Sequence, residues 1–73
     1  MFANIEKINR IRNEYPAGTR VQLISMDDPY SRLKTGDEGI VKFVDDIGTI
    51  HVGWDCGSSL GLVYGVDQFR KIM

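Results

Sequence analysis

The stretch that decides the fold is Thr49–Ser58, which reads TIHVGWDCGS. In its first half Ile50, Val52 and Trp54 share one face of an extended chain, and the residues between them are polar or glycine. This period of two is typical of a β-strand that is buried on one side. The residues that follow, Asp55–Ser58, favour a tight turn. The stretch therefore predicts a strand and the start of a hairpin, with the tryptophan in the core.

Other segments of the chain also have the composition of short strands separated by glycine and aspartate turns. We expect strands at Thr19–Met26, Asp37–Val44, Ser59–Val63 and Arg70–Ile72, with a single helical turn at Val66–Phe69 before the last of them. Gly39 stands where a small barrel needs a bulge or a close backbone approach. About five short strands in one small domain predict an SH3-like barrel over residues 16–73. An OB-type barrel is the alternative, although it normally has longer strands.

The first fifteen residues predict an amphipathic helix in front of the barrel. Ile5, Ile8 and Ile11 recur at helical spacing, Asn4 is a suitable N-cap, and Pro16 ends the helix. A helix this short needs a partner for its apolar side. Two partners are open: the barrel of the same chain, or a second copy of the chain in a homodimer.

Composition limits the possible classes of protein. The chain has 73 residues, which is enough for one domain, and a net charge of −1, which provides no general attraction for polyanions. Its single cysteine cannot form an internal disulfide, and neither a signal peptide nor a membrane-spanning segment is evident. We therefore expect a cytoplasmic protein that does not enter a membrane.

Four parts of the chain together resemble a known family. They are YPAGTRV at Tyr15–Val21, MDDPY at Met26–Tyr30, the run Val44–Leu62 that contains the tryptophan, and GVDQF at Gly65–Phe69. The chain is similar in these parts to the small bacterial and phage domains grouped as domain of unknown function 4314. That family has no assigned activity, so the resemblance implies no site residues; it implies an origin in bacteria, their phages or mobile elements.

A second, shorter resemblance concerns the tryptophan hairpin. VGWDCGS at Val52–Ser58, followed by Tyr64 and Gly65, is similar to the valine, tryptophan, aspartate and glycine string of the mind-bomb type repeat. That repeat is a barrel that binds partner peptides, so this resemblance implies a barrel fold and, more faintly, peptide binding.

The residues that carry catalysis in other proteins are isolated here. His51 is the one histidine and Cys56 the one cysteine, so neither has a partner of its own kind for a nucleophilic or metal centre. The acidic pairs Asp27-Asp28 and Asp45-Asp46 match no calcium loop and are better explained as turn caps. Asp55 is interpreted in the same way, as an anchor of its hairpin. We expect no enzyme activity, no cofactor and no metal.

The residues most suited to contact a partner lie in expected loops. Tyr30 and Tyr64 are aromatic residues without an evident place in the core, and Arg32 and Lys34 flank the same long loop as Tyr30. That loop has about ten residues, long enough to suggest a function. We therefore predict a non-enzymatic module that binds an unknown protein partner through this loop, Tyr64 and the helix.

The alternative function is a nucleic-acid-binding accessory factor. In that case basic side chains would contact phosphates while a nearby tyrosine stacks on a base. The candidate phosphate contacts are Arg20, Arg32, Lys34, Lys42, Arg70 and Lys71.

Overall fold

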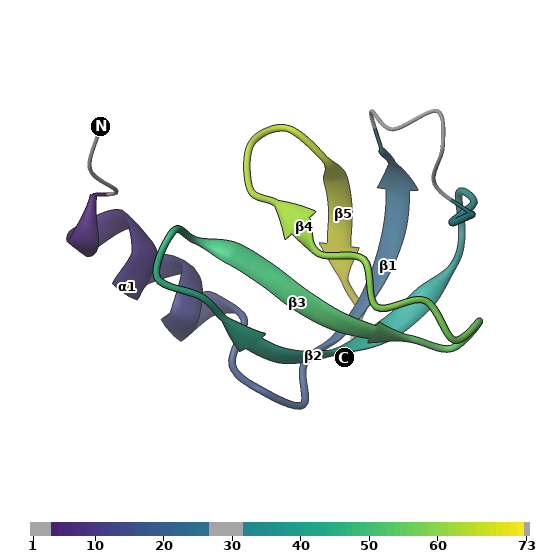
Figure 1. Ribbon diagram of the computed structural model, residues 1–73, viewed down its shortest axis with the longest axis horizontal. Helices are drawn as coiled ribbons and strands as arrows, with labels where there is room; N and C mark the ends of the chain where they lie inside the picture. The colour runs from purple at the N-terminus through teal and green to yellow at the C-terminus, as the bar shows by residue number, and fades with distance from the viewer. Residues whose placement is uncertain (1–3, 27–31, 73) are drawn as a thin grey trace.

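The computed structural model of the protein describes residues 4–26 and 32–72. One helix is followed by five strands (Figure 1). Their bounds are α1 Ile5–Glu14, β1 Arg20–Ser25, β2 Glu38–Val44, β3 Thr49–Trp54, β4 Leu62–Val63 and β5 Gln68–Lys71. The mainly β architecture with one N-terminal helix is confirmed.

The five strands form one antiparallel sheet in the order β4-β3-β2-β1-β5. Consecutive strands from β1 to β4 are neighbours, and β5 returns to pair with β1, with Val21 opposite Lys71 and Leu23 opposite Phe69. The sheet bends strongly, so that β1 and β5 stand across the line of β2 and β3 in Figure 1. This arrangement confirms the SH3-like barrel that the sequence predicts.

Helix α1 lies against the turn between β2 and β3 (Figure 1). The Oδ1 atom of Asn4 accepts a hydrogen bond from the Lys7 amide at 3.1 Å, which confirms the expected N-cap. Ile8 and Ile11 are buried against this chain's own barrel, whereas Ile5 is 72% exposed. The barrel is therefore the partner of two of the three isoleucines, and a homodimer seam through α1 would have only Ile5 of this stripe to bury.

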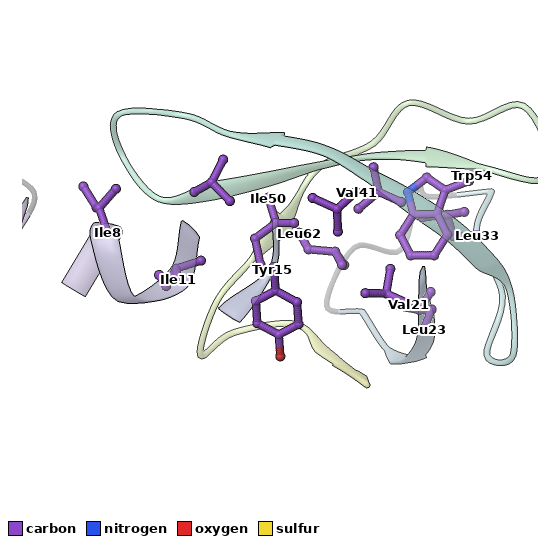
Figure 2. Close-up of a cluster of buried hydrophobic side chains, with 12 residues drawn as sticks. Ile8, Ile11, Tyr15, Val21, Leu23, Leu33, Val41, Ile50, Trp54 and Leu62 are labelled. Carbon is purple, nitrogen blue, oxygen red and sulfur yellow. The ribbon is translucent and has the colours of Figure 1, made fainter. Parts of the chain in front are cut away.

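The buried side chains form one cluster that runs from α1 to the tryptophan hairpin (Figure 2). Trp54 is 4% exposed, and its indole Nε1 donates a hydrogen bond to the Leu60 carbonyl at 2.8 Å. The prediction that Trp54 belongs to the core is confirmed. Gly39 makes the expected close approach: an added Cβ would lie 2.8 Å from the Gly53 carbonyl oxygen and 2.9 Å from Trp54 Cα.

The predicted fourth strand, Ser59–Val63, is too long at its beginning, because β4 covers only Leu62–Val63. The alternation of Leu60 with Leu62 resembles a strand. However, the backbone before Leu62 folds over the tryptophan instead of joining the ladder, since the Leu60 carbonyl accepts from Trp54 and the Leu60 amide donates to Ser58 Oγ.

The predicted helical turn at Val66–Phe69 is wrong, and the last strand begins earlier than predicted. β5 covers Gln68–Lys71, so Phe69 is paired with Leu23 in the sheet. The chain reverses just before this, where the Val63 carbonyl accepts the amides of Val66 and Asp67. Phe69 is then held in the strand because its ring packs against Tyr15, with centroids 5.2 Å apart.

Candidate interaction surface

Arg32 and Lys34, two of the predicted contact residues, are exposed on the segment that leads into β2. Leu33 between them is buried in the core, so the alternation of an extended chain turns both cations outward. The Lys34 amide donates to Asp37 Oδ2 at 2.9 Å, which fixes this end of the loop. Tyr30, the third predicted residue, lies outside the described residues.

Tyr64, the fourth predicted residue, lies in the turn between β4 and β5 and is 39% exposed. It is only partly available, because its ring packs edge-on against Tyr15 with centroids 6.4 Å apart. Burial of Tyr15 raises the pKa of its hydroxyl, and the nearby charge of Glu14 raises that pKa further. Within the described residues no hydrogen bond, ion pair or ring contact joins Tyr64 to Arg32 or Lys34, so the prediction that they contact one partner stays a prediction.

A different group of exposed apolar side chains gathers on the outside of the sheet. Ile40 is 44% exposed, Phe43 54% and Val63 47%. Phe43 stacks on His51, with ring centroids 4.4 Å apart and an angle of 12° between the rings. Val63 lies opposite Thr49, and Thr49 is two residues from His51 in β3. The side chains of Val63 and His51 are therefore on the same side of the sheet. We call Ile40, Phe43, His51 and Val63 the outer sheet face.

A β-bulge creates the outer sheet face. The register of β2 against β3 shifts between Val41 and Phe43, so Lys42 is an extra residue in β2. Strict alternation from the buried Val41 would place Phe43 inside; after the bulge Phe43 is exposed and Val44 is buried. The period of two in the sequence did not predict this surface. The available signal was that Phe43 and Val44 are adjacent apolar residues, so one of them must be exposed in a strand that is buried on one side.

His51 is held in place by Asp45. The Asp45 Oδ2 atom and His51 Nε2 are 2.8 Å apart, and Asp45 Oδ1 accepts the amides of Ile47 and Thr49 at 3.1 and 2.9 Å. The prediction that aspartate caps this turn is thereby confirmed for Asp45. Partial burial acts to raise the pKa of Asp45, but the hydrogen bonds from His51 and the two amides outweigh it, and the pKa lies below its ordinary value.

The pKa of Asp45 leads to a prediction about stability and pH. The folded pKa is below the ordinary 3.8, so ionised Asp45 stabilises the fold above that pH, and the contribution is lost as the pH falls through the lowered value. We expect Asp45→Asn to lower the free energy of unfolding at neutral pH by about 1–2 kcal/mol. The variant should also lose less stability than the parent between about pH 4 and pH 2. Urea unfolding at several pH values measures both, and parallel pH profiles would contradict the assignment.

The remaining acidic residues of interest make ion pairs with arginines. Asp46 pairs with Arg12 of α1 at 2.9 Å. Asp55 pairs with Arg20 of β1, so its carboxylate joins two strands and does more than anchor its own turn. Asp27 and Asp28 lie outside the described residues. Among the residues that are described, no three histidine, cysteine, aspartate or glutamate side chains gather in a way that could hold a metal ion.

The six candidate phosphate contacts are not equally available. Arg20 lies in ion pairs with both Asp55 and Glu38, and these hydrogen bonds and charges raise the pKa of Arg20. The Arg70 Nε atom donates to Gln22 Oε1 at 2.8 Å, and the Lys71 ammonium lies 5.2 Å from the centroid of the Tyr15 ring. Arg32, Lys34 and Lys42 are exposed, as are Arg70 and Lys71, whereas Arg20 is half-buried.

The fold and this surface define the class of the protein: a small SH3-like barrel capped by an N-terminal helix, with an exposed apolar face outside the sheet. The chain belongs to the family described as domain of unknown function 4314, whose model matches residues 4–72. The family resemblance stated from the sequence is therefore confirmed. No curated protein and no solved structure gives a significant match. None of the helices in the described part of the chain is long and apolar enough to cross a membrane.

Proposed function

We propose that this protein is a non-enzymatic interaction module that binds another protein through the outer sheet face. The observation that carries the proposal is the exposure of Phe43. This residue is 54% exposed because of the bulge, and its ring stacks on His51, which is in turn positioned by Asp45. Exposed and rigidly held aromatic side chains frequently anchor protein interfaces.

The surroundings of Phe43 indicate the chemistry of the partner. Ile40 and Val63 extend the apolar surface, and beyond Ile40 in the register lies Arg20, whose charge is balanced by Glu38 and Asp55. An apolar centre beside a polar rim with balanced charge is the usual anatomy of a protein interface. Lys42, which makes no ion pair among the described residues, lies over Gly53 beside this surface, but a polyanion would need several cations around the aromatic ring. We therefore infer a partner protein with an apolar contact surface.

The proposal also includes the origin of the protein, its location in the cell and further partner contacts. The proposed origin is a bacterium, its phage or a mobile element, which the family resemblance implies. The proposed location is the cytoplasm, which fits one unpaired cysteine at Cys56. Arg32, Lys34 and Tyr64 stay predicted partner contacts, as does Tyr30.

The test compares partner capture by two single-residue variants. Phe43→Ser removes the exposed ring, whereas Val66→Ser changes a side chain that is 61% exposed in the turn between β4 and β5 and lies outside the outer sheet face. Both should fold, because neither side chain is in the core. We expect a host protein to be enriched by the parent and by Val66→Ser, and reduced about tenfold or more with Phe43→Ser. Quantitative mass spectrometry of nuclease-treated lysate measures this ratio.

Two outcomes would contradict the proposal. In one, no captured protein distinguishes Phe43→Ser from the parent. In the other, binding is to DNA or RNA with an affinity that falls steeply as salt rises, which is the mark of phosphate contacts. A salt titration with single-stranded and duplex probes detects the second outcome.

A further inference from the structure

The sheet has two edge strands, β4 and β5, and β4 is already protected. The Val63 amide points away from β3 and donates to Asp67 Oδ2 at 2.9 Å. The Val63 carbonyl accepts the amides of Val66 and Asp67 at 3.1 and 3.0 Å. The turn that follows β4 therefore uses the backbone groups that another strand would need.

The other edge is different, because the backbone groups of Phe69 and Lys71 face away from the sheet. Phe69 lies opposite Leu23, whose amide and carbonyl bond to Asp37 and Gly36 on the side of β2. Lys71 lies opposite Val21, which has the same orientation two residues earlier in β1. The residues of β5 whose backbone groups bond to β1 are therefore those that alternate with Phe69 and Lys71, such as Arg70.

No described residue completes the outward hydrogen bonds of β5. Among the helices and strands, β5 contacts β1 alone. Within residues 4–26 and 32–72, no hydrogen bond outside the ladder involves the amide or carbonyl of Phe69 or Lys71. Among the described residues, two amides and two carbonyls along one short edge thus have no partner, which is the arrangement that accepts an added strand.

The side chains of this edge carry positive charge on both faces of the sheet. Arg70 lies on the outer face beside Gln22, and Lys71 lies on the opposite face over the Tyr15 ring. Neither cation belongs to any ion pair of the described residues. A second copy of the chain pairing through the same edge would bring these cations against their equivalents, which is unfavourable.

We propose that the β5 edge binds an extended acidic segment of a partner protein by strand addition. The backbone of the segment would bond to Phe69 and Lys71, and its acidic side chains would lie near Arg70 and Lys71. This inference rests on the proposed function, because it takes the partner to be a protein. It concerns a different surface, so the two proposals can fail separately.

The orientation of the edge is tested first on the free chain. Amide hydrogen exchange measured by NMR should be fast at Phe69 and Lys71 and slow at Arg70, whose amide lies in the ladder. Protection of all three amides would show that the edge is already covered and would overturn the proposal.

Binding is tested with three probes followed by amide resonances of the labelled chain. The first is an eight-residue peptide that alternates glutamate and valine, the second replaces each glutamate by lysine, and the third is an eight-nucleotide single-stranded DNA. We expect the acidic peptide alone to shift and protect the amides of Phe69 and Lys71. Equal binding of the lysine peptide, or shifts at β5 caused by the DNA, would overturn the proposal.

Two variants of one residue separate charge from backbone bonding. Lys71→Ala removes the charge, and Lys71→Pro removes the charge and the outward amide while leaving the amides that bond to β1. We expect affinity for the acidic peptide to fall a few-fold in the first variant and about tenfold further in the second. Equal affinities would exclude strand addition. If Lys71→Pro does not fold, a synthetic chain with an N-methylated Lys71 makes the same comparison with the charge retained.

The location of the shifts separates this proposal from the proposed function. Shifts confined to the outer sheet face would reject the β5 edge and leave the module proposal standing. Absence of any shift with the acidic peptide also rejects the edge, and the capture ratio for Phe43→Ser still decides the module proposal independently.

Discussion

Trp54→Ala is expected to cost the protein about 3–5 kcal/mol of its free energy of unfolding. The side chain is 4% exposed and stands at one end of the buried cluster in Figure 2. Its removal leaves a cavity and also leaves the Leu60 carbonyl without the indole donor. A domain of this size has a total stability of roughly 4–11 kcal/mol. The variant should therefore lose a large part of its stability, and thermal unfolding followed by circular dichroism should show a clearly lower midpoint than that of the parent.

Trp54→Phe provides the matched control for this prediction. Phenylalanine retains an aromatic ring in the core but cannot donate to Leu60. We expect the free energy of unfolding of Trp54→Phe to lie between that of the parent and that of Trp54→Ala. A Trp54→Ala variant that unfolds with the midpoint of the parent would show that the tryptophan is not part of the scaffold.

Gly39→Ala is expected to be the second most damaging change, with a loss of about 2–3 kcal/mol. The added Cβ would lie 2.6 Å from Val52 Cγ1 and under 3.0 Å from backbone atoms of Gly53 and Trp54. A side chain can move away from such a contact, but the backbone of a central strand pair cannot move without separating β2 from β3. Urea unfolding measures the loss.

Gly57→Ala is the control for the general cost of replacing glycine. An added Cβ at Gly57 meets nothing within 4 Å, so the only cost in that variant is that alanine must adopt the positive φ of 95° that glycine tolerates. We expect this to cost about 1 kcal/mol. Equal losses for Gly39→Ala and Gly57→Ala would contradict the close approach of the two strands.

Much of the fold could be predicted because it depends on local patterns. The period of two in β3 placed Trp54 inside, and the spacing of Ile8 and Ile11 with Asn4 in front defined α1. These signals lie within a few residues of one another. Tertiary contacts reinforce them here, so the local preference and the final structure agree.

The errors arose where contacts between distant residues decide the outcome. Leu60 has the alternation of a strand, but its carbonyl is taken by the Trp54 indole. The residues Val66–Phe69 predict a helical turn, but the packing of Phe69 on Tyr15, which is distant in the sequence, keeps Phe69 in β5. The extra residue Lys42 shifts the register of β2, and no local signal states which way a bulge turns the next side chain.

The candidate site was less predictable than the fold. The sequence correctly placed Arg32 and Lys34 on the exterior, but it did not show that Tyr64 leans on Tyr15. The exposure of Phe43 depends on the bulge, and no pattern in the sequence pairs its ring with that of His51. Exposure of a strand residue is determined by register, which short sequence patterns specify weakly.

NMR mapping with a partner identified by capture will show whether the barrel is a scaffold whose outer sheet face binds a protein. On titration of that partner, we expect the amide resonances of Ile40, Phe43, His51 and Val63 to shift. Phe43→Ser should abolish these shifts, and Val66→Ser should retain them. Shifts centred elsewhere, or unchanged by Phe43→Ser, would contradict the proposal.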